Sequence, residues 1–238
     1  MLLLWIARLD LTKTEASLAR NSGTSTSGGY RKGDEARQRI IKVALKQFDA
    51  AGLKGTTTRQ IASEAGVTLP ALQYYFGGKL GLYRVCAEEV VRHYWRLVEF
   101  SSNDAAVIFD ADSDPEIARA QLKALFRALV TLPSQTSTWA QFVFREIGEP
   151  GPAFDVLYQG LWDPCISIVA ELIRQIEGKD AKPLNTRIQA LLLLSSLLAF
   201  QGGQKFSLRV LGLQRMGVAE TELVLDHLDR QIDAIGKA

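Results

Sequence analysis

Cysteine and histidine are scarce in this sequence, so few residues are present that could bind a metal, form a disulfide or act as a catalyst. Two cysteines and two histidines occur among 238 residues. Cys86 and Cys165 lie far apart without metal-ligand spacing, which argues against a disulfide framework and favours a reducing compartment. His93 and His227 stand in no metal-ligand pattern, and the chain has neither a phosphate-binding glycine loop nor a nucleophile elbow. We therefore expect no metal, no cofactor and no catalytic residue.

Long apolar runs are also lacking. Residues 2–7 are apolar but too few for a signal-peptide core, and Asp10 and Lys13 follow them closely. Residues 188–200 form a run of thirteen that includes two serines, whereas crossing a bilayer requires about twenty apolar residues. We expect a cytoplasmic protein that does not enter the membrane.

Charge is unevenly distributed along the chain, although the formal net charge is only +2. Residues 31–84 contain ten Lys/Arg and four Asp/Glu, a net charge of +6, whereas residues 85–238 carry −5. A basic segment on an acidic body suits a protein in which one part meets a polyanion. On charge alone, a solvated basic face explains the pattern equally well.

The periodicity of apolar residues predicts an all-α fold. Residues 1–33 are expected to be a poorly ordered tail, because residues 21–29 are rich in Ser, Thr and Gly and have little apolar surface to bury. Beyond them no segment shows the period-two alternation of a strand. We expect helices over residues 34–51, 58–64, 68–75, 79–100, 115–132, 139–147, 153–177 (bent at Pro164), 183–201 and 221–235. Asp34 is the expected N-cap of the first helix, and Gly52 is expected to end it with a positive φ.

Residues 57–76 (TTRQIASEAGVTLPALQYYF) predict two short helices around a tight turn. Thr57 or Thr58 can cap the first helix and Thr68 the second, while Gly66 supplies the positive φ of the turn. The buried positions expected from the spacing are Ile61, Ala62, Ala65, Leu72 and Phe76. The second helix then presents small residues, a glutamine and two tyrosines outward. Such a face suits a DNA major groove, because small groups contact base edges while hydroxyls reach phosphates.

With the helix before it, this segment resembles the N-terminal domain of the TetR repressor family. The resemblance rests on residues 37–52, TTRQIA at 57–62, AGV at 65–67, YYF at 74–76, Lys79 and the Leu-Tyr pair at 82–83. It implies that Thr57 caps its helix against a phosphate, that the second short helix enters the major groove, and that Lys79 binds a phosphate. The position of Gln73 is often a tyrosine in the family, so its role stays open between adenine and phosphate. The expected DNA-binding residues are Thr57, Thr58, Arg59, Thr68, Leu69, Pro70, Ala71, Gln73, Tyr74, Tyr75 and Lys79. Arg59 could instead form a salt bridge with Glu64.

The same resemblance implies a larger helical domain for ligand binding and dimerisation. Residues 144–158 (FREIGEPGPAFDVLY) are similar to the matching stretch of regulators with a CecR-type C-terminal domain. We therefore expect a tail at residues 1–33, a helix-turn-helix domain at 34–83 and a regulatory and dimerisation domain at 84–238.

The helix over residues 183–201 is apolar nearly all round and must be buried on more than one side. A twin subunit can cover one side; the alternative is a central core helix in a monomer. The expected dimer interface comprises Leu191, Leu194, Ser195, Leu198, Leu228 and Ile232. The candidate wall of a ligand pocket comprises Trp139, Phe142, Tyr158, Trp162 and Phe206, with His93, Arg145 and Gln201 as polar contacts. Each of these eight residues can equally be an ordinary core or surface residue.

The sequence thus predicts a transcription regulator that binds a palindromic double-stranded DNA operator as a homodimer and responds to a small-molecule inducer as a repressor. Two alternatives retain DNA binding: a regulator without a small-molecule inducer, and an activator. The alternative from another class is an all-helical enzyme.

Overall fold

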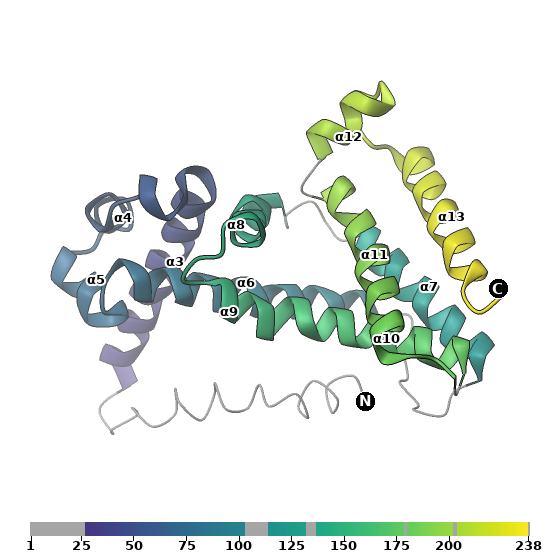
Figure 1. The fold of residues 1–238 in the computed structure, drawn as a ribbon. Helices are drawn as coiled ribbons and strands as arrows, with labels where there is room; N and C mark the ends of the chain where they lie inside the picture. The colour runs from purple at the N-terminus through teal and green to yellow at the C-terminus, as the bar shows by residue number, and fades with distance from the viewer. Residues whose placement is uncertain (1–26, 103–113, 132–136, 179, 202–203, 238) are drawn as a thin grey trace. The chain divides into compact units, whose positions relative to one another are not determined.

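The computed structural model describes residues 27–102, 114–131, 137–178, 180–201 and 204–237, and these contain helices and no strand (Figure 1). The helices are α3 (Ser27–Gly55), α4 (Thr58–Glu64), α5 (Leu69–Phe76), α6 (Lys79–Ser102), α7 (Pro115–Thr131), α8 (Ser137–Gly148), α9 (Phe154–Leu157), α10 (Asp163–Glu177), α11 (Pro183–Gln201), α12 (Gln204–Leu211) and α13 (Val218–Ala234). A π-helical turn, Tyr158–Trp162, joins α9 to α10. The predicted all-α fold is confirmed.

Two compact units divide the described residues. One contains residues 27–93 and 137–161, and the other contains residues 94–131 and 162–237. We call them the helix-turn-helix unit and the C-terminal unit. Residues 137–161 pack with the N-terminal helices, although they follow the expected boundary at residues 83–84 by more than fifty positions. The division into domains at 34–83 and 84–238 stays a prediction. The two compact units have other boundaries.

The first helix differs from its prediction at both ends. It begins at Ser27, so Asp34 lies inside the helix and is not its N-cap. One contact that favours this extension comes from α5, since the Tyr75 hydroxyl lies close to Gly33. Gly52 adopts the expected positive φ of 70°, but the chain resumes its helical path after this kink. Helix α3 buries an apolar stripe: Ile40, Ile41, Ala44, Leu45 and Phe48.

The C-terminal unit is built on a core shared by α7, α10, α11 and α13. Phe126, Leu172 and Ile173 are fully buried in it. The same core contains Leu228 and Ile232 of α13, which corrects their assignment to a dimer interface. They are buried within the subunit because α13 turns its apolar face toward α7.

Ionic contacts align α7 with α13. The buried Arg119 guanidinium donates to the carbonyls of Ile232 (2.5 Å) and Ile235 (3.1 Å) at the end of α13. One and two turns further along α7, Lys123 pairs with Asp233 (2.8 Å) and Arg127 pairs with Glu222 (3.1 Å). Three cations at a spacing of four therefore bind one side of α13.

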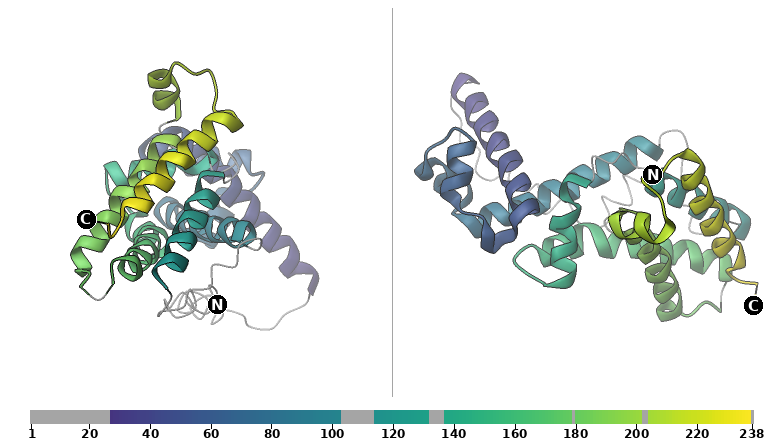
Figure 2. Two further views of the ribbon diagram at one scale, coloured as in Figure 1. Left: turned by 90° about the vertical axis from the view of Figure 1, so that its right-hand side faces the viewer. Right: turned by 90° about the horizontal axis from the view of Figure 1, so that it is seen from above.

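Two features of the C-terminal half were incompletely predicted. The helix expected over residues 153–177 is interrupted by the π-helical turn, which ends two residues before Pro164 in the first turn of α10. The sequence pattern missed α12, an eight-residue helix that stands at the end of α11, away from α7 (Figures 1 and 2). The Ser207 hydroxyl of α12 donates to the Ala199 carbonyl of α11 at 2.6 Å, a contact that periodicity cannot reveal.

Two helical stretches, Phe154–Glu177 and Pro183–Phe200, have the length and hydropathy of a membrane span. Core helices of soluble proteins have the same length and hydropathy. Half of the first stretch is buried inside the protein, but only 22% of the second.

The turn between α5 and α6 leaves no room for a side chain at Gly81. A Cβ atom built there would lie 1.9 Å from the carbonyl oxygen of Phe76. The backbone of α5 therefore packs directly on the first turn of α6, which places the end of α5.

We predict that Gly81→Ala destabilises the protein, because the new methyl group must displace a backbone carbonyl. Overpacking of this kind costs about 1–3 kcal/mol. Urea unfolding followed by circular dichroism measures the change. Gly148→Ala is the matched control, since a Cβ at the end of α8 meets no atom within 4 Å. Equal stability of the two variants would contradict the close approach at Gly81.

Candidate nucleic-acid interface

The first short helix, α4, is held at its start by a reciprocal pair of hydrogen bonds. Thr57 is the N-cap, and its hydroxyl oxygen accepts from the backbone N–H of Gln60 at 3.2 Å. The Gln60 side-chain oxygen accepts in turn from the N–H of Thr57 at 3.0 Å. This capping box confirms Thr57 as the cap. The prediction overlooked Gln60, although its position three residues after the threonine is a recognised signal.

The Thr57 hydroxyl is fully engaged in the free protein, because it also donates to Gln60 Oε1 at 2.8 Å. To donate to a DNA phosphate it must rotate away from this oxygen. After that rotation the hydroxyl oxygen still accepts from the backbone N–H of Gln60, so α4 keeps its cap.

The second short helix, α5, begins at the predicted cap and follows the predicted turn. The Thr68 hydroxyl accepts from the N–H of Ala71 at 3.3 Å. Gly66 has a φ of 66°, a conformation that is strained for residues with a Cβ atom. The turn is closed by the N–H of Val67, which donates to the Ala62 carbonyl at 3.0 Å.

The two faces of α5 separate as the spacing predicts. Leu72 and Phe76 are buried in the helix-turn-helix unit, whereas Tyr74 is 86% exposed. Of the other outward residues, Leu69, Pro70 and Gln73 are exposed and Ala71 and Tyr75 are half-buried. The helix therefore offers a largely exposed face to a partner, as reading a DNA groove requires.

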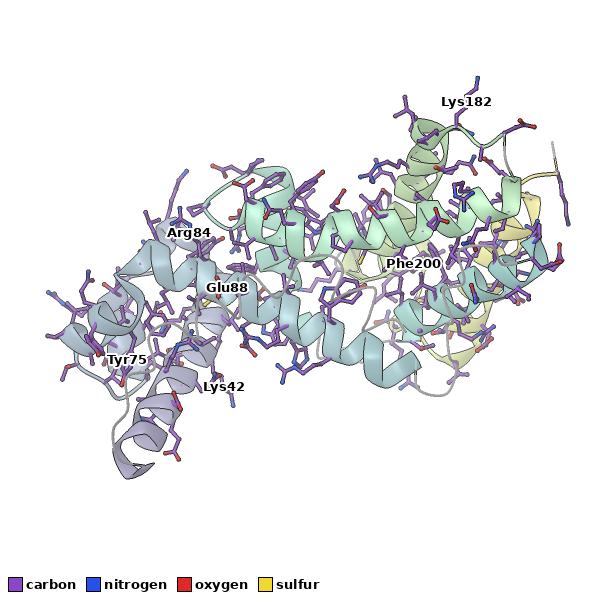
Figure 3. The ribbon with its side chains drawn as sticks, turned by 90° about the horizontal axis from the view of Figure 1, so that it is seen from below. Lys42, Tyr75, Arg84, Glu88, Lys182 and Phe200 are labelled. Atoms are coloured by element: carbon purple, nitrogen blue, oxygen red, sulfur yellow. The ribbon has the colours of Figure 1, made fainter. Side chains whose placement is uncertain are left out.

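Three polar side chains at the end of α5 differ in their surroundings. The Gln73 amide lies beside Gly78, where a Cβ atom would approach its oxygen to 3.3 Å. Tyr75 reaches back toward α3, and its ring lies 5.5 Å from that of Tyr74 (Figure 3). Lys79 is half-buried in the first turn of α6. Gln73 and Lys79 thus flank the turn between α5 and α6.

The salt bridge considered for Arg59 is not formed, because Glu64 has other partners. Gln47 Nε2 donates to Glu64 at 2.7 Å and Lys46 Nζ at 3.2 Å. These bonds from Gln47 and Lys46 lower the pKa of Glu64. Arg59 itself is exposed on an open groove between α3 and α4 that Gln60 also lines.

Comparison with protein families agrees with this geometry. Residues 40–86 match the model of bacterial regulatory proteins of the TetR family. Residues 118–238, half of the chain, match the C-terminal domain of the HTH-type transcriptional dual regulator CecR. This protein belongs to the TetR family and carries a CecR-type C-terminal domain. It is a transcriptional regulator and not an enzyme.

Similar proteins fit this TetR-family assignment. The transcriptional dual regulator CecR of Shigella flexneri is 29% identical over 210 residues, which cover 86% of this chain and 92% of that protein. The regulator BetI of Burkholderia thailandensis is 29% identical over 119 residues, covering 48% of this chain and 56% of that protein. Among solved structures, a TetR-like regulator from Rhodococcus sp. RHA1 has a TM-score of 0.59 at 18% identity, covering 84% of this chain and 94% of that one. A TetR-family regulator from Streptomyces coelicolor has a TM-score of 0.57 at 20% identity, covering 86% and 95%.

The residues expected to line a ligand pocket are divided between the two units. His93, Trp139, Phe142, Arg145 and Tyr158 lie in the helix-turn-helix unit, and Trp162, Gln201 and Phe206 lie in the C-terminal unit. The predicted pocket wall draws residues from both units and stays a prediction.

Several of these residues lie in the core, on the surface or against backbone carbonyls. Phe142 packs in the core on Tyr83, with ring centroids 4.7 Å apart. Phe206 is 71% exposed on α12, and Arg145 binds backbone carbonyls of α3. The side chain of Gln201 lies outside the described residues.

We predict that Lys79→Ala and Tyr74→Ala weaken binding to every DNA sequence alike, because the resemblance implies a phosphate contact for Lys79 and the hydroxyl of the exposed Tyr74 can reach a phosphate. Removing the lysine should also lower the slope of log K against log salt concentration by about one. Fluorescence anisotropy on a fragment selected by the wild-type protein and on a random duplex measures both effects.

Lys54→Ala is the control for this prediction. Lys54 is an exposed cation of the same unit, paired with Glu149 at 3.2 Å, and it lies outside α4, α5 and their turns. If Lys79→Ala changes neither the affinity for DNA nor the dependence of that affinity on salt concentration, the phosphate assignment is wrong.

Proposed function

We propose that this regulator represses transcription by binding a palindromic operator as a homodimer, and that a small, largely apolar molecule releases it. The observation that carries the proposal is the outward face of α5. Its two apolar anchors, Leu72 and Phe76, are buried, while Leu69, Pro70, Gln73 and Tyr74 are exposed. Such a helix is built to meet a surface outside its own subunit. A DNA-binding role also places the protein in the cytoplasm.

The residues of this face have separate roles in the proposed complex. Pro70, Ala71 and Gln73 read base edges, since small groups fit thymine methyls and a glutamine pairs with adenine. Thr57 and Lys79 bind phosphates and set the register of the helix. The remaining proposed contacts are Thr58, Arg59, Thr68, Leu69, Tyr74 and Tyr75. In a dimer two such helices enter successive major grooves, about 34–36 Å apart.

Dimerisation is supported by the free face of α11. Exposed positions recur along one side of this helix at the spacing of an amphipathic stripe: Ile188, Leu191, Leu192, Ser195, Leu198 and Ala199. The opposite side, with Ala190, Leu193 and Leu197, is buried in the core of the C-terminal unit. Leu194 lies between these sides and packs against that core. Leu191, Ser195 and Leu198 are therefore the proposed interface residues, and Leu194 contributes to the fold of the subunit.

We predict that Leu191→Arg converts the dimer into a folded monomer. Leu191 is 53% exposed in the subunit, so an arginine there is tolerated in the monomer but leaves an unpaired charge in a desolvated interface. Sedimentation velocity measures the mass, and circular dichroism the helix content. Ile117→Arg on α7 is the control, because Ile117 is equally exposed at 54% and lies outside the stripe. A wild-type protein that sediments as a folded monomer would exclude the dimer.

The effector is proposed to bind among the helices of residues 85–210. Support comes from the large apolar content of this part of the chain and from α6, which begins at Lys79 beside the reading helix and continues into the C-terminal unit. A ligand that acts on α6 could change the spacing of the two reading helices in a dimer. We propose Trp162, which is half-buried in the C-terminal unit, as a residue of this site.

We predict that any molecule that releases the operator binds less tightly to the operator complex than to the free protein. Linkage requires the two affinities to change by the same factor. Calorimetric titration of candidate apolar molecules into both states measures the factor, and an apolar molecule that does not shift the melting point is the control. Release of the operator with equal affinity for both states would contradict the mechanism. If no tested molecule releases the operator, the result favours the alternative of a DNA-binding regulator without a small-molecule inducer.

A further inference from the structure

Helix α8 is tied to α3 by polar contacts near the Gly52 kink. The Arg145 guanidinium donates to the carbonyl of Phe48 at 2.7 Å and to that of Ala50 at 3.4 Å. Asp49, between them, accepts from the backbone N–H of Phe142 at 3.0 Å. These three contacts hold the last turns of α3 beside the kink at Gly52.

The residue next to Arg145 reaches a different helix. Glu146 is only 3% exposed, and its carboxylate accepts from the Tyr83 hydroxyl of α6 at 3.0 Å. It also accepts from the N–H of Gly151 at 3.0 Å. Burial and the neighbouring carboxylate raise the pKa of Tyr83, so its hydroxyl remains a donor throughout the physiological range. Arg145 and Glu146 therefore connect α8 to the two helices that flank the helix-turn-helix in the sequence.

An aromatic cluster completes this junction. Phe48 of α3 and Tyr83 of α6 meet edge to face, with ring centroids 4.8 Å apart. Tyr83 also contacts Phe142 of α8, at 4.7 Å. Rings from three helices thus set the spacing of the helices, while directional hydrogen bonds to Arg145 and Glu146 set their rotation.

We propose that Arg145 and Glu146 are positioning residues for DNA reading, which hold α3 and α6 at the relative orientation that α5 needs to fit a major groove. The inference rests on the DNA-binding function proposed above. Neither residue is assigned a DNA contact, so both act through the helices they bind. Helix α8 lies within the CecR-type C-terminal match, yet it packs in the helix-turn-helix unit. A helix from the C-terminal part of the sequence therefore stabilises the arrangement of the DNA-binding helices.

Two variants test this role by different chemistry. Arg145→Gln removes the charge and the forked donor from the α3 carbonyls, and Tyr83→Phe removes the hydroxyl that pairs with Glu146 while keeping the aromatic ring. Glu149→Gln is the matched control, because Glu149 links the end of α8 to Lys54 of α3 through an exposed ion pair. Exposed pairs contribute little to stability.

The experiment compares a palindromic fragment selected by the wild-type protein with a random duplex of equal length. Affinities are measured by fluorescence anisotropy well below the melting midpoint of each variant. We expect Arg145→Gln and Tyr83→Phe to weaken binding to the selected fragment about tenfold, the size of effect expected from a lost charged hydrogen bond. Affinity for the random duplex should change less than twofold, and Glu149→Gln should match the wild type. Arg145→Lys, which keeps one cationic donor, should recover part of the loss.

Three results would overturn the inference. Both variants could retain the wild-type ratio of specific to random binding, or they could lose both affinities in parallel, as a merely destabilised fold would. If the control variant lost as much specificity as the other two, the effect would belong to any contact between α3 and α8. A wild-type protein that selects no fragment would instead overturn the proposed function, and the inference with it.

Discussion

An eight-residue helix does not hold its conformation alone in water, because isolated helices shorter than about 12–15 residues are marginal. Helix α5 has eight residues, so its shape and direction depend on contacts with the rest of its unit. Leu72 and Phe76 anchor it from below, the Thr68 cap holds its start, and the close approach of Gly81 to the Phe76 carbonyl places its end. The proposed reading of DNA by α5 therefore depends on these few contacts.

The helices around α5 must then be placed with equal care, and the structure uses two kinds of contact to do so. Aromatic packing of Phe48, Tyr83 and Phe142 is strong but tolerant of rotation. The bonds of Arg145 and Glu146 are directional. The bond between Tyr83 and Glu146 is buried and that from Arg145 to the Phe48 carbonyl is part-buried, so their loss leaves unpaired polar groups. A buried carboxylate is costly to maintain, and a role in orientation gives a reason for its presence here.

The C-terminal unit solves a different problem, since it must be stable and still leave one helix face free. The three cations of α7 hold α13 against the core, and Arg119 binds the carbonyls at the end of α13. Their contacts leave the outer stripe of α11, around Leu191, without a partner among the described residues. Helix α11 therefore serves the subunit core with one face and the proposed dimer interface with the other.

The sequence by itself determined most of the helices, the cap at Thr68 and the outward face of α5, and it narrowed the cap of α4 to Thr57 or Thr58. These depend on neighbours one to four residues apart, and local spacing records such neighbours directly. Tertiary structure alone decided the partners of Arg145, which lie 95 and 97 residues away, and the burial of Leu228 and Ile232 inside the subunit. It also decided the start of α3 at Ser27, where a composition typical of linkers is helical. Periodicity shows that a side chain is apolar or polar, but which surface covers it depends on how distant helices pack.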